Sequence, residues 1–326
     1  MKRIIALCLC LTLISCFAFV FTSCSEEENG GLIFKSNGDG TCAVTGVKDN
    51  SVVEVNIPYS SPNGDVVTSI ASGAFSNCAV LENITIPHGV TSIGSRAFEK
   101  CTWLKEVTIP VGVTRIEERT FYECNYLESV HIPHTVTFIG DEAFYKCAFL
   151  NEITIPNGVT SIGKSAFSFS RIYSITIPES VTTIGYEAFY FCDQLRSVTI
   201  SGNVANIGES AFSKCHLLES VTLGEGLSVI ADGMFMSCGD IKSVTIPSTV
   251  RSIGEFAFSG CANMTSVTIG KGVTNIGYNA FGFCESLETV NYVGSEEDWA
   301  KIDINPHGNY CLKNAAISYN YVLTEE

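Results

Sequence analysis

The sequence predicts an elongated solenoid of about ten stacked coils, with a parallel β-sheet on one side and short helical turns on the other. The first observation is a phenylalanine that recurs every 23 residues, with a single interval of 22 residues. The second is an apolar pattern in the same register, C-x-x-L-x-x-V-T-I-P-x-G-V-T-S-I-G-x-x-A-F-x-x. One such unit is too small to close a core, so neighbouring units must stack to bury their apolar side chains. The phenylalanine column comprises Phe75, Phe98, Phe121, Phe144, Phe167, Phe189, Phe212, Phe235, Phe258 and Phe281.

Each unit contains three segments with different roles. V-T-I alternates with period 2 and predicts a short strand with Val and Ile inward and Thr outward. A proline such as Pro110 or Pro133 then ends that strand, because proline cannot donate a ladder hydrogen bond. V-T-S-I-G predicts a second short extended segment, and x-x-A-F-x-x-C predicts about one helical turn. A repeat period of about 20 to 29 residues on an apolar pattern is typical of a leucine-rich-repeat solenoid.

The N-terminal end of the stack is expected to carry a β-hairpin cap over residues 32–52. Asn37-Gly38-Asp39-Gly40 is strong turn chemistry between two strand-like runs. The solenoid itself is expected to occupy residues 53–290. Its first coil has extra residues around Ser61 to Gly64, which predict a surface loop because insertions in repeats usually form loops.

The C-terminal end is expected to be closed by a cap over residues 291–326. Ser295 is a good helix N-cap, and the acidic residues that follow it suit the first turn of a helix. Trp299 and Ile302 then lie on one helical face, and a strand is predicted from Ala316. A solenoid needs such caps because its end coils would otherwise expose apolar surface and unpaired strand edges.

Residues 1–24 have the pattern of a lipoprotein signal peptide, with a basic start, a long apolar run and a small-residue cleavage site. The sequence from Phe21 to Cys24 resembles the lipobox of bacterial lipoproteins, although Phe21 stands where Leu is usual. This resemblance implies lipidation of Cys24. A second box that ends at Cys16 is an alternative, and so is an uncleaved membrane anchor.

Residues 25–31 form an acidic tether that begins Ser-Glu-Glu-Glu. An acidic run beside a lipidated cysteine resembles the surface-export signal of Bacteroidetes lipoproteins, and an ordinary solvated tether is the alternative. The two resemblances together imply a bacterial cell-envelope protein, lipid-anchored in the outer membrane and exposed at the surface. The sequence does not decide between the two sides of that membrane.

The repeat as a whole resembles the BspA-like leucine-rich-repeat family of bacterial surface proteins. The resemblance rests on Leu-x-x-Val-Thr-Ile-Pro-x-Gly-Val-Thr-x-Ile-Gly-x-x-Ala-Phe-x-x-Cys and covers residues 53–290. Membership implies a solenoid and, for some members, adhesion to host or bacterial partners. It does not identify a ligand.

The charge of the chain and the positions of its cysteines exclude one class of partner and indicate the state of the thiols. The chain has 19 Lys and Arg against 34 Asp and Glu, and an acidic rod repels phosphate backbones, so no nucleic-acid partner is expected. Nine of the 15 cysteines occupy one repeat column, where neighbouring side chains are expected to point the same way. That arrangement favours buried, reduced thiols over disulfides. The repeat-column cysteines are Cys78, Cys101, Cys124, Cys147, Cys192, Cys215, Cys238, Cys261 and Cys284.

The sequence contains no recognisable catalytic machinery. Gly158 to Ser165 matches the phosphate-loop pattern G-x-x-x-x-G-K-S, but its glycines belong to the ordinary repeat text and no substantial helix is expected after it. No serine or cysteine is accompanied by a recognisable base and orienting acid. We therefore expect no enzyme activity, no cofactor and no metal site.

One feature exceeds what the repeat requires. The position two residues after the cysteine carries Trp103, Tyr126 and Phe149 in three consecutive coils, whereas most later coils carry polar residues there. Tyr122 and Tyr145 occur in the same region, and His131 is expected to point outward from the adjoining strand. Exposed aromatic clusters provide large contact areas, so these six residues are candidates for binding a partner. Half-buried packing at the corner of the coil is the alternative.

The sequence thus predicts a surface-displayed leucine-rich-repeat binding protein, an adhesin or interaction module for a protein or glycan partner. A structural envelope protein without a dedicated ligand is one alternative. A hydrolase with an unrecognised site is the other. The sequence leaves the oligomeric state open.

Overall fold

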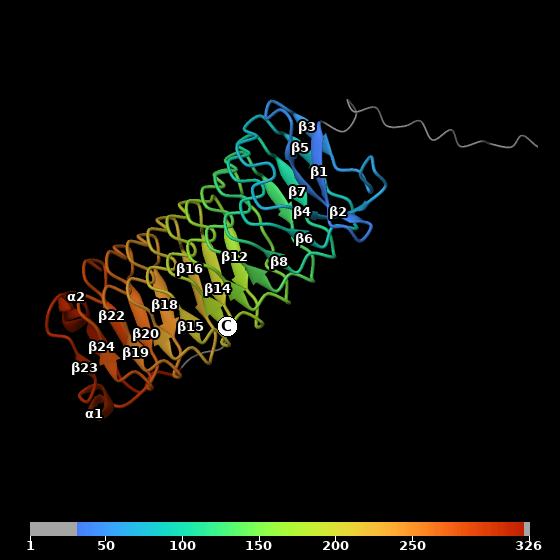
Figure 1. Ribbon diagram of the computed structural model, residues 1–326. Coiled ribbons are helices and arrows are strands. Elements are labelled where there is room, and N and C mark those ends of the chain that lie inside the picture. Colours follow the sequence, from blue (N-terminus) through green and yellow to red (C-terminus); the bar gives the residue numbers. More distant parts are fainter. Residues whose placement is uncertain (1–30, 323–326) are drawn as a thin grey trace, which may run out of the picture.

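The computed structural model describes residues 31–322, which form an elongated rod of stacked coils (Figure 1). Most coils contribute one strand to each of two sheets that run along the rod, and residues 151–156, which form no strand, leave a gap in one of them. The leucine-rich-repeat solenoid is confirmed, but the rod has about twelve turns rather than ten. The difference arises because part of the predicted C-terminal cap continues the path of the coils.

The first sheet is built from the V-T-I segments. Its strands pair in parallel and in register, so that Thr199 lies beside Thr222 on the outer face. Hydrogen bonding divides it into three pieces, β3-β5-β7-β9, β12-β14-β16 and β18-β20-β22-β24. The strands are β3 (Glu54–Asn56), β5 (Asn83–Thr85), β7 (Glu106–Thr108), β9 (Ser129–His131), β12 (Ser174–Ile177), β14 (Ser197–Ile200), β16 (Ser220–Leu223), β18 (Ser243–Ile246), β20 (Ser266–Ile269), β22 (Thr289–Tyr292) and β24 (Ala316–Ser318).

The second sheet is built from the T-S-I segments, as predicted, and most of its strands have only two residues. Its three hydrogen-bonded pieces are β1-β2-β4-β6, β8-β10-β11-β13-β15 and β17-β19-β21-β23. The strands are β1 (Leu32–Ser36), β2 (Thr41–Val47), β4 (Val66–Ile70), β6 (Ser92–Ile93), β8 (Arg115–Ile116), β10 (Phe138–Ile139), β11 (Ser161–Ile162), β13 (Thr183–Ile184), β15 (Asn206–Ile207), β17 (Val229–Ile230), β19 (Ser252–Ile253), β21 (Asn275–Ile276) and β23 (Asp303–Ile304).

The third side of the rod consists of turns, not of the helical turns that the sequence predicted. In each coil two residues that flank the phenylalanine adopt positive φ, as Arg119 and Glu123 do at 55°. The N–H groups of Arg119, Phe121 and Glu123 then donate to carbonyl oxygens of the next coil at 2.8 to 2.9 Å. These bonds all point toward the C-terminal end, so the turns form a ladder with one direction. A helical turn would have directed the same N–H groups back into its own coil.

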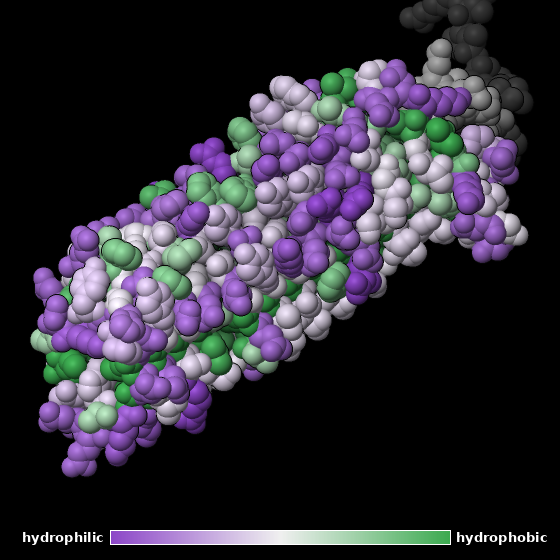
Figure 2. Space-filling model, turned by 60° about the vertical axis from the view of Figure 1, so that its left-hand side comes forward, coloured by the Kyte–Doolittle hydropathy of each residue, from purple (hydrophilic) through white to green (hydrophobic). Residues whose placement is uncertain are grey.

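The core is a set of columns rather than a layer. The ten repeat phenylalanines are fully buried and stack with ring centroids 4.9 to 5.7 Å apart. Valine, isoleucine and leucine columns fill the remaining interior, while hydrophilic residues cover much of the outside (Figure 2). Burial of each ring therefore depends on the coils on both sides, as expected for a repeat stack.

The cysteine column is buried and reduced, as predicted for the cysteines within residues 31–322. Its thiols also make a bond that the sequence did not indicate. The Sγ of Cys124 donates to the carbonyl oxygen of Phe98 in the preceding coil at 3.0 Å, and this bond recurs along the column. The donors are Cys101, Cys124, Cys147, Cys192, Cys215, Cys238, Cys261 and Cys284. In the shorter coil Ser170 replaces cysteine, and its hydroxyl donates to Phe167 of its own coil instead.

The N-terminal hairpin is present, with β1 and β2 antiparallel around a turn that contains Gly38 and Gly40 at positive φ. Its strand β2 pairs in parallel with β4, so the hairpin caps the second sheet. The inserted loop of the first coil folds back on itself, with the N–H of Ser61 donating to the carbonyl of Asp65 at 2.8 Å.

The C-terminal segment follows the path of a further coil (Figure 1). β22 and β24 extend the first sheet, β23 extends the second, and α2 (Tyr310–Asn314) occupies the turn side. The predicted helix is α1 (Glu296–Trp299), and its N-cap Ser295 accepts a bond from the N–H of Asp298. The fully buried Asn309 terminates the ladder of turns, because its Oδ1 accepts from the N–H of Phe281 at 3.1 Å.

Candidate interaction surface

Trp103, Tyr126 and Phe149 form one continuous stack on the surface, which we call the aromatic ladder. Ring centroids lie 4.6 Å apart between Trp103 and Tyr126, and 4.9 Å apart between Tyr126 and Phe149. The three residues remain 45%, 36% and 43% exposed, whereas the leucine that follows each of them is fully buried. The ladder is therefore a surface feature that lies over the core.

The backbone fixes the register of the ladder. The N–H of Tyr126 donates to the carbonyl of Thr102 at 3.0 Å, and the N–H of Phe149 donates to that of Asn125 at 3.0 Å. These bonds place equivalent positions of neighbouring coils directly side by side. Three aromatic residues in this column must consequently lie one coil apart, close to the strand spacing of about 4.8 Å.

The planes of the rings decide what the ladder can contact. They are nearly parallel, with angles of 8° and 19° between neighbours, so the rings cover one another's faces. The faces that meet within the stack are therefore closed to a partner, and the remaining exposed aromatic surface is available for apolar contact.

Tyr122 and Tyr145 belong to a separate stack on the turn side of the rod. Their centroids lie 5.0 Å apart at an angle of 8°. The guanidinium of Arg119 lies 4.9 Å from the Tyr122 ring, and the ammonium of Lys146 lies 5.3 Å from the Tyr145 ring. Both cations are also paired with carboxylates of neighbouring coils, Arg119 with Glu142 at 2.7 Å and Lys146 with Glu123 at 3.3 Å.

These contacts shift the ionisation of the groups around the second stack. The hydrogen bond to Glu142 raises the pKa of Arg119, and the hydrogen bond to Glu123 raises the pKa of Lys146. Burial raises the pKa of the Tyr122 hydroxyl. The two cations therefore stay charged over the tyrosine rings at every physiological pH, and Tyr122 stays neutral.

The second stack continues beyond the two tyrosines that the sequence indicated. Phe169 contacts the edge of Tyr145 at 5.5 Å, Phe191 stacks on Phe169 at 5.2 Å, and His216 meets Phe191 at 5.5 Å. Phe169 and Phe191 adopt positive φ, which is unusual for bulky side chains. The signal in the sequence was their position two residues after the repeat phenylalanine, where most coils carry a polar residue or glycine.

The structure does not join His131 to either stack. It lies exposed on β9 beside Thr108, and no aromatic contact to it is found within residues 31–322. The six predicted residues thus divide into the aromatic ladder, the Tyr122–Tyr145 pair and an isolated histidine. Cys24, the predicted lipidation site, lies outside the described residues.

No group of three or more His, Cys, Asp and Glu side chains within residues 31–322 is arranged to hold a metal ion. The same part of the chain contains no helix of the length and apolarity required to cross a membrane.

These features define a leucine-rich-repeat solenoid, a fold that is generally non-enzymatic. The model of the BspA type leucine rich repeat region matches residues 68–196 and 182–302 in six copies. Because these matches cover well over half of the chain, the protein belongs to the BspA-type leucine-rich-repeat family.

Solved structures to which the chain is similar come from several bacteria. A leucine rich cell surface protein from Faecalibacterium prausnitzii is 27% identical, with 84% of this chain and 96% of that chain aligned at a TM-score of 0.44. A leucine-rich repeat protein from Bacteroides ovatus is 24% identical, with 89% and 98% aligned at a TM-score of 0.42. One from Eubacterium ventriosum is 22% identical, with 79% and 88% aligned at 0.45. No curated protein matches the chain.

Proposed function

We propose that this chain is a cell-surface binding protein that captures a protein partner through the aromatic ladder and performs no chemistry. The observation that carries the proposal is the exposed stack of Trp103, Tyr126 and Phe149. The core does not need these rings, because equivalent positions in later coils carry Gln194, Asp240 and Asn263.

The proposal includes an anchor and a location. A lipid on Cys24 would hold the rod in the outer membrane of a bacterium, with the acidic tether of residues 25–31 between lipid and solenoid. Surface exposure is supported by the similarity to a cell surface protein of Faecalibacterium prausnitzii. Protease added to intact cells should then remove the rod, and its survival would place it on the inner side of the membrane.

The binding role is tested by changing Trp103, Tyr126 and Phe149 together to Ser. Truncating an aromatic side chain at a binding hot spot commonly reduces the free energy of binding by on the order of 2 kcal/mol. Capture of surface proteins from the cells or host material that surround the bacterium should therefore weaken at least tenfold, since about 1.4 kcal/mol corresponds to one decade.

The matched control changes Gln194, Asp240 and Asn263 to Ser in the same column of later coils. This variant should capture the same proteins as the parent, and both variants should melt within a few degrees of it. Equal capture by the ladder variant, or early unfolding of that variant alone, would show that the ladder serves packing and that the binding site lies elsewhere.

A further inference from the structure

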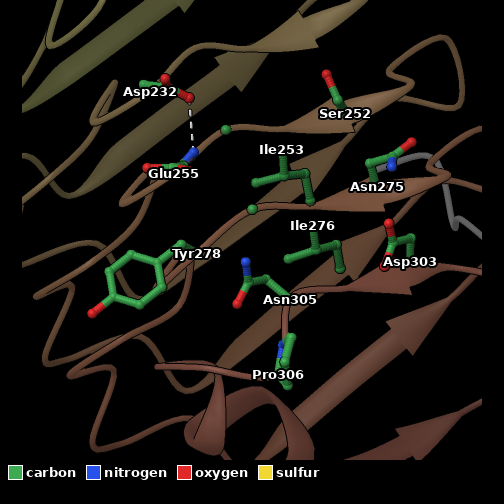
Figure 3. A pocket seen from close by; sticks show the side chains of 12 residues that line it. Asp232, Ser252, Ile253, Glu255, Asn275, Ile276, Tyr278, Asp303, Asn305 and Pro306 are labelled. Carbon is green, nitrogen blue, oxygen red and sulfur yellow. Dashed lines mark hydrogen bonds between the residues drawn. The ribbon is translucent and has the colours of Figure 1, made fainter.

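A recess of about 440 Å³ lies near the C-terminal end of the rod, several coils away from the aromatic ladder (Figure 3). It is bordered by the ends of β19, β21 and β23 on the second sheet and by Asn305 and Pro306, which follow β23. Its volume is within the range of about 300 to 1,000 Å³ found for small-molecule sites.

The repeat itself creates the floor of this recess. Gly254 and Gly277 follow β19 and β21, and a Cβ on either would lie 2.7 Å from a backbone nitrogen of the preceding coil. The glycines therefore leave a strip along the sheet where no side chain covers the backbone. After β23 the chain carries Asn305 and Pro306 instead of the glycine, and these two residues close the strip at one end.

The lining offers both hydrogen-bond donors and acceptors. The Oδ1 of Asn275 accepts from Thr274 Oγ1 at 2.8 Å, and the Oδ1 of Asn305 accepts from the N–H of His307 at 3.0 Å. These bonds orient both amides and keep their NH2 groups available as donors. The carboxylates of Glu255, which follows β19, and of Asp303 on β23 supply acceptors.

An aromatic side chain stands beside these polar groups. Tyr278 is 40% exposed, and an edge contact with Phe256 at 5.2 Å supports its ring. Figure 3 shows Tyr278 and Asp303 on opposite sides of the recess with Asn305 between them. The recess thus combines a ring that can contact C–H groups with polar groups that can reach hydroxyls.

The charge of the lining restricts the ligand. Asp232, Glu255 and Asp303 contribute carboxylates, and none of the described lining residues is Lys, Arg or His. Phosphate, sulfate or carboxylate groups would be repelled, because nothing in the recess compensates their charge. A bare metal ion needs acceptors only and would leave the two amide donors unused. Hydroxyl groups, which donate and accept at once, match the whole lining.

We propose that this recess binds a neutral hexose unit of a glycan. This site is separate from the protein contact proposed for the aromatic ladder, on other coils and with other chemistry. The two proposals can therefore fail independently, and a variant of the ladder should keep glycan binding intact.

The test uses residues 25–326 on an array of neutral hexose oligosaccharides, sialylated oligosaccharides and sulfated oligosaccharides. Binding is expected to the neutral set alone, and the strongest neutral oligosaccharide is then titrated against variants. Tyr278→Ala and Asp303→Asn should each weaken binding at least fivefold. Asp303 is exposed, so its variant tests the site even if Tyr278→Ala disturbs the fold.

The matched control is Tyr186→Ala. Tyr186 follows Gly185 as Tyr278 follows Gly277, and it is 42% exposed, but it lies on a coil without the closing loop. Its variant should bind like the parent. Absence of binding to every neutral oligosaccharide, preference for the charged sets, or an equal loss in Tyr186→Ala would overturn the proposal.

Discussion

Replacing Cys124 with alanine tests whether the cysteine column stabilises the rod through hydrogen bonds as well as through packing. The side chain is fully buried, and its thiol donates to the Phe98 carbonyl at 3.0 Å. Loss of one intramolecular hydrogen bond costs about 0.5 to 1.5 kcal/mol, and a thiol donor belongs at the low end of that range. Loss of the buried sulfur, which is similar in size to a methylene group, adds on the order of 1 kcal/mol. The expected total is about 1.5 kcal/mol.

The assay is urea unfolding of residues 25–326, with the change in free energy taken from the shift in midpoint at constant slope. Cys124→Ser is the companion variant and should be destabilised by a similar amount. At Ser170 a hydroxyl in this column turns to its own coil, so serine is not expected to restore the bond between coils.

The control is Thr108→Ala, which removes an exposed side chain of the first sheet and should change stability by less than about 0.5 kcal/mol. A loss below about 0.5 kcal/mol in Cys124→Ala would refute the argument, since neither the bond nor the sulfur could then contribute as calculated. Disulfides between neighbouring column cysteines in the purified protein would refute its premise.

Two further predictions concern the cysteines. Burial raises the pKa of Cys78 to about 11, so its reactive thiolate should be scarce at pH 8. Alkylation of the native protein should be slow at this pH and should accelerate as the pH approaches 11. Unfolding without reductant should expose all column thiols to the reagent at once. Fast labelling of the column cysteines in the native protein would contradict the structure. Cys24→Ala should abolish acyl labelling and membrane retention, and labelling that persists until Cys16→Ala is introduced would assign the lipid to the other box.

The sequence predicted the columns well because every repeat places a given position in the same surroundings. The alternation in Ser-Val-Thr-Ile was sufficient to predict that Thr199 points outward and Val198 inward. In the structure Thr199 is exposed and Val198 is buried. The column of Trp103 and its neighbours could likewise be predicted to stack, because its members are one period apart. Contacts between equivalent positions of neighbouring coils can therefore be predicted from a repetitive sequence.

Other features could not be predicted because they depend on where the hydrogen bonds go. The Ala-Phe segment has the spacing of a helical turn, but carbonyls of the adjacent coil draw its N–H groups outward and impose positive φ at Arg119 and Glu123. The last coil escaped recognition because Asp303 to Pro306 lacks the repeat text. The recess could not be predicted for the same reason, because Asn305 and Pro306, which close it, belong to that coil. His131 and Tyr122 share a region of sequence with the aromatic ladder but belong to different columns, so the fold separates them.

The one-way ladder of turns makes the solenoid extendable only as a directional polymer. On the turn side each coil receives N–H groups from the preceding coil and donates its own to the next, so a duplicated unit inserted between two coils would find both neighbours ready to bond. The ends are not equivalent, because the last regular coil presents the N–H groups of Asn279 and Phe281, which the carbonyl of His307 and the Oδ1 of Asn309 accept. Gain or loss of whole 23-residue units would therefore change the length of the rod in steps of about 4.8 Å. Such changes would set the separation between the aromatic ladder and the C-terminal recess without altering either one.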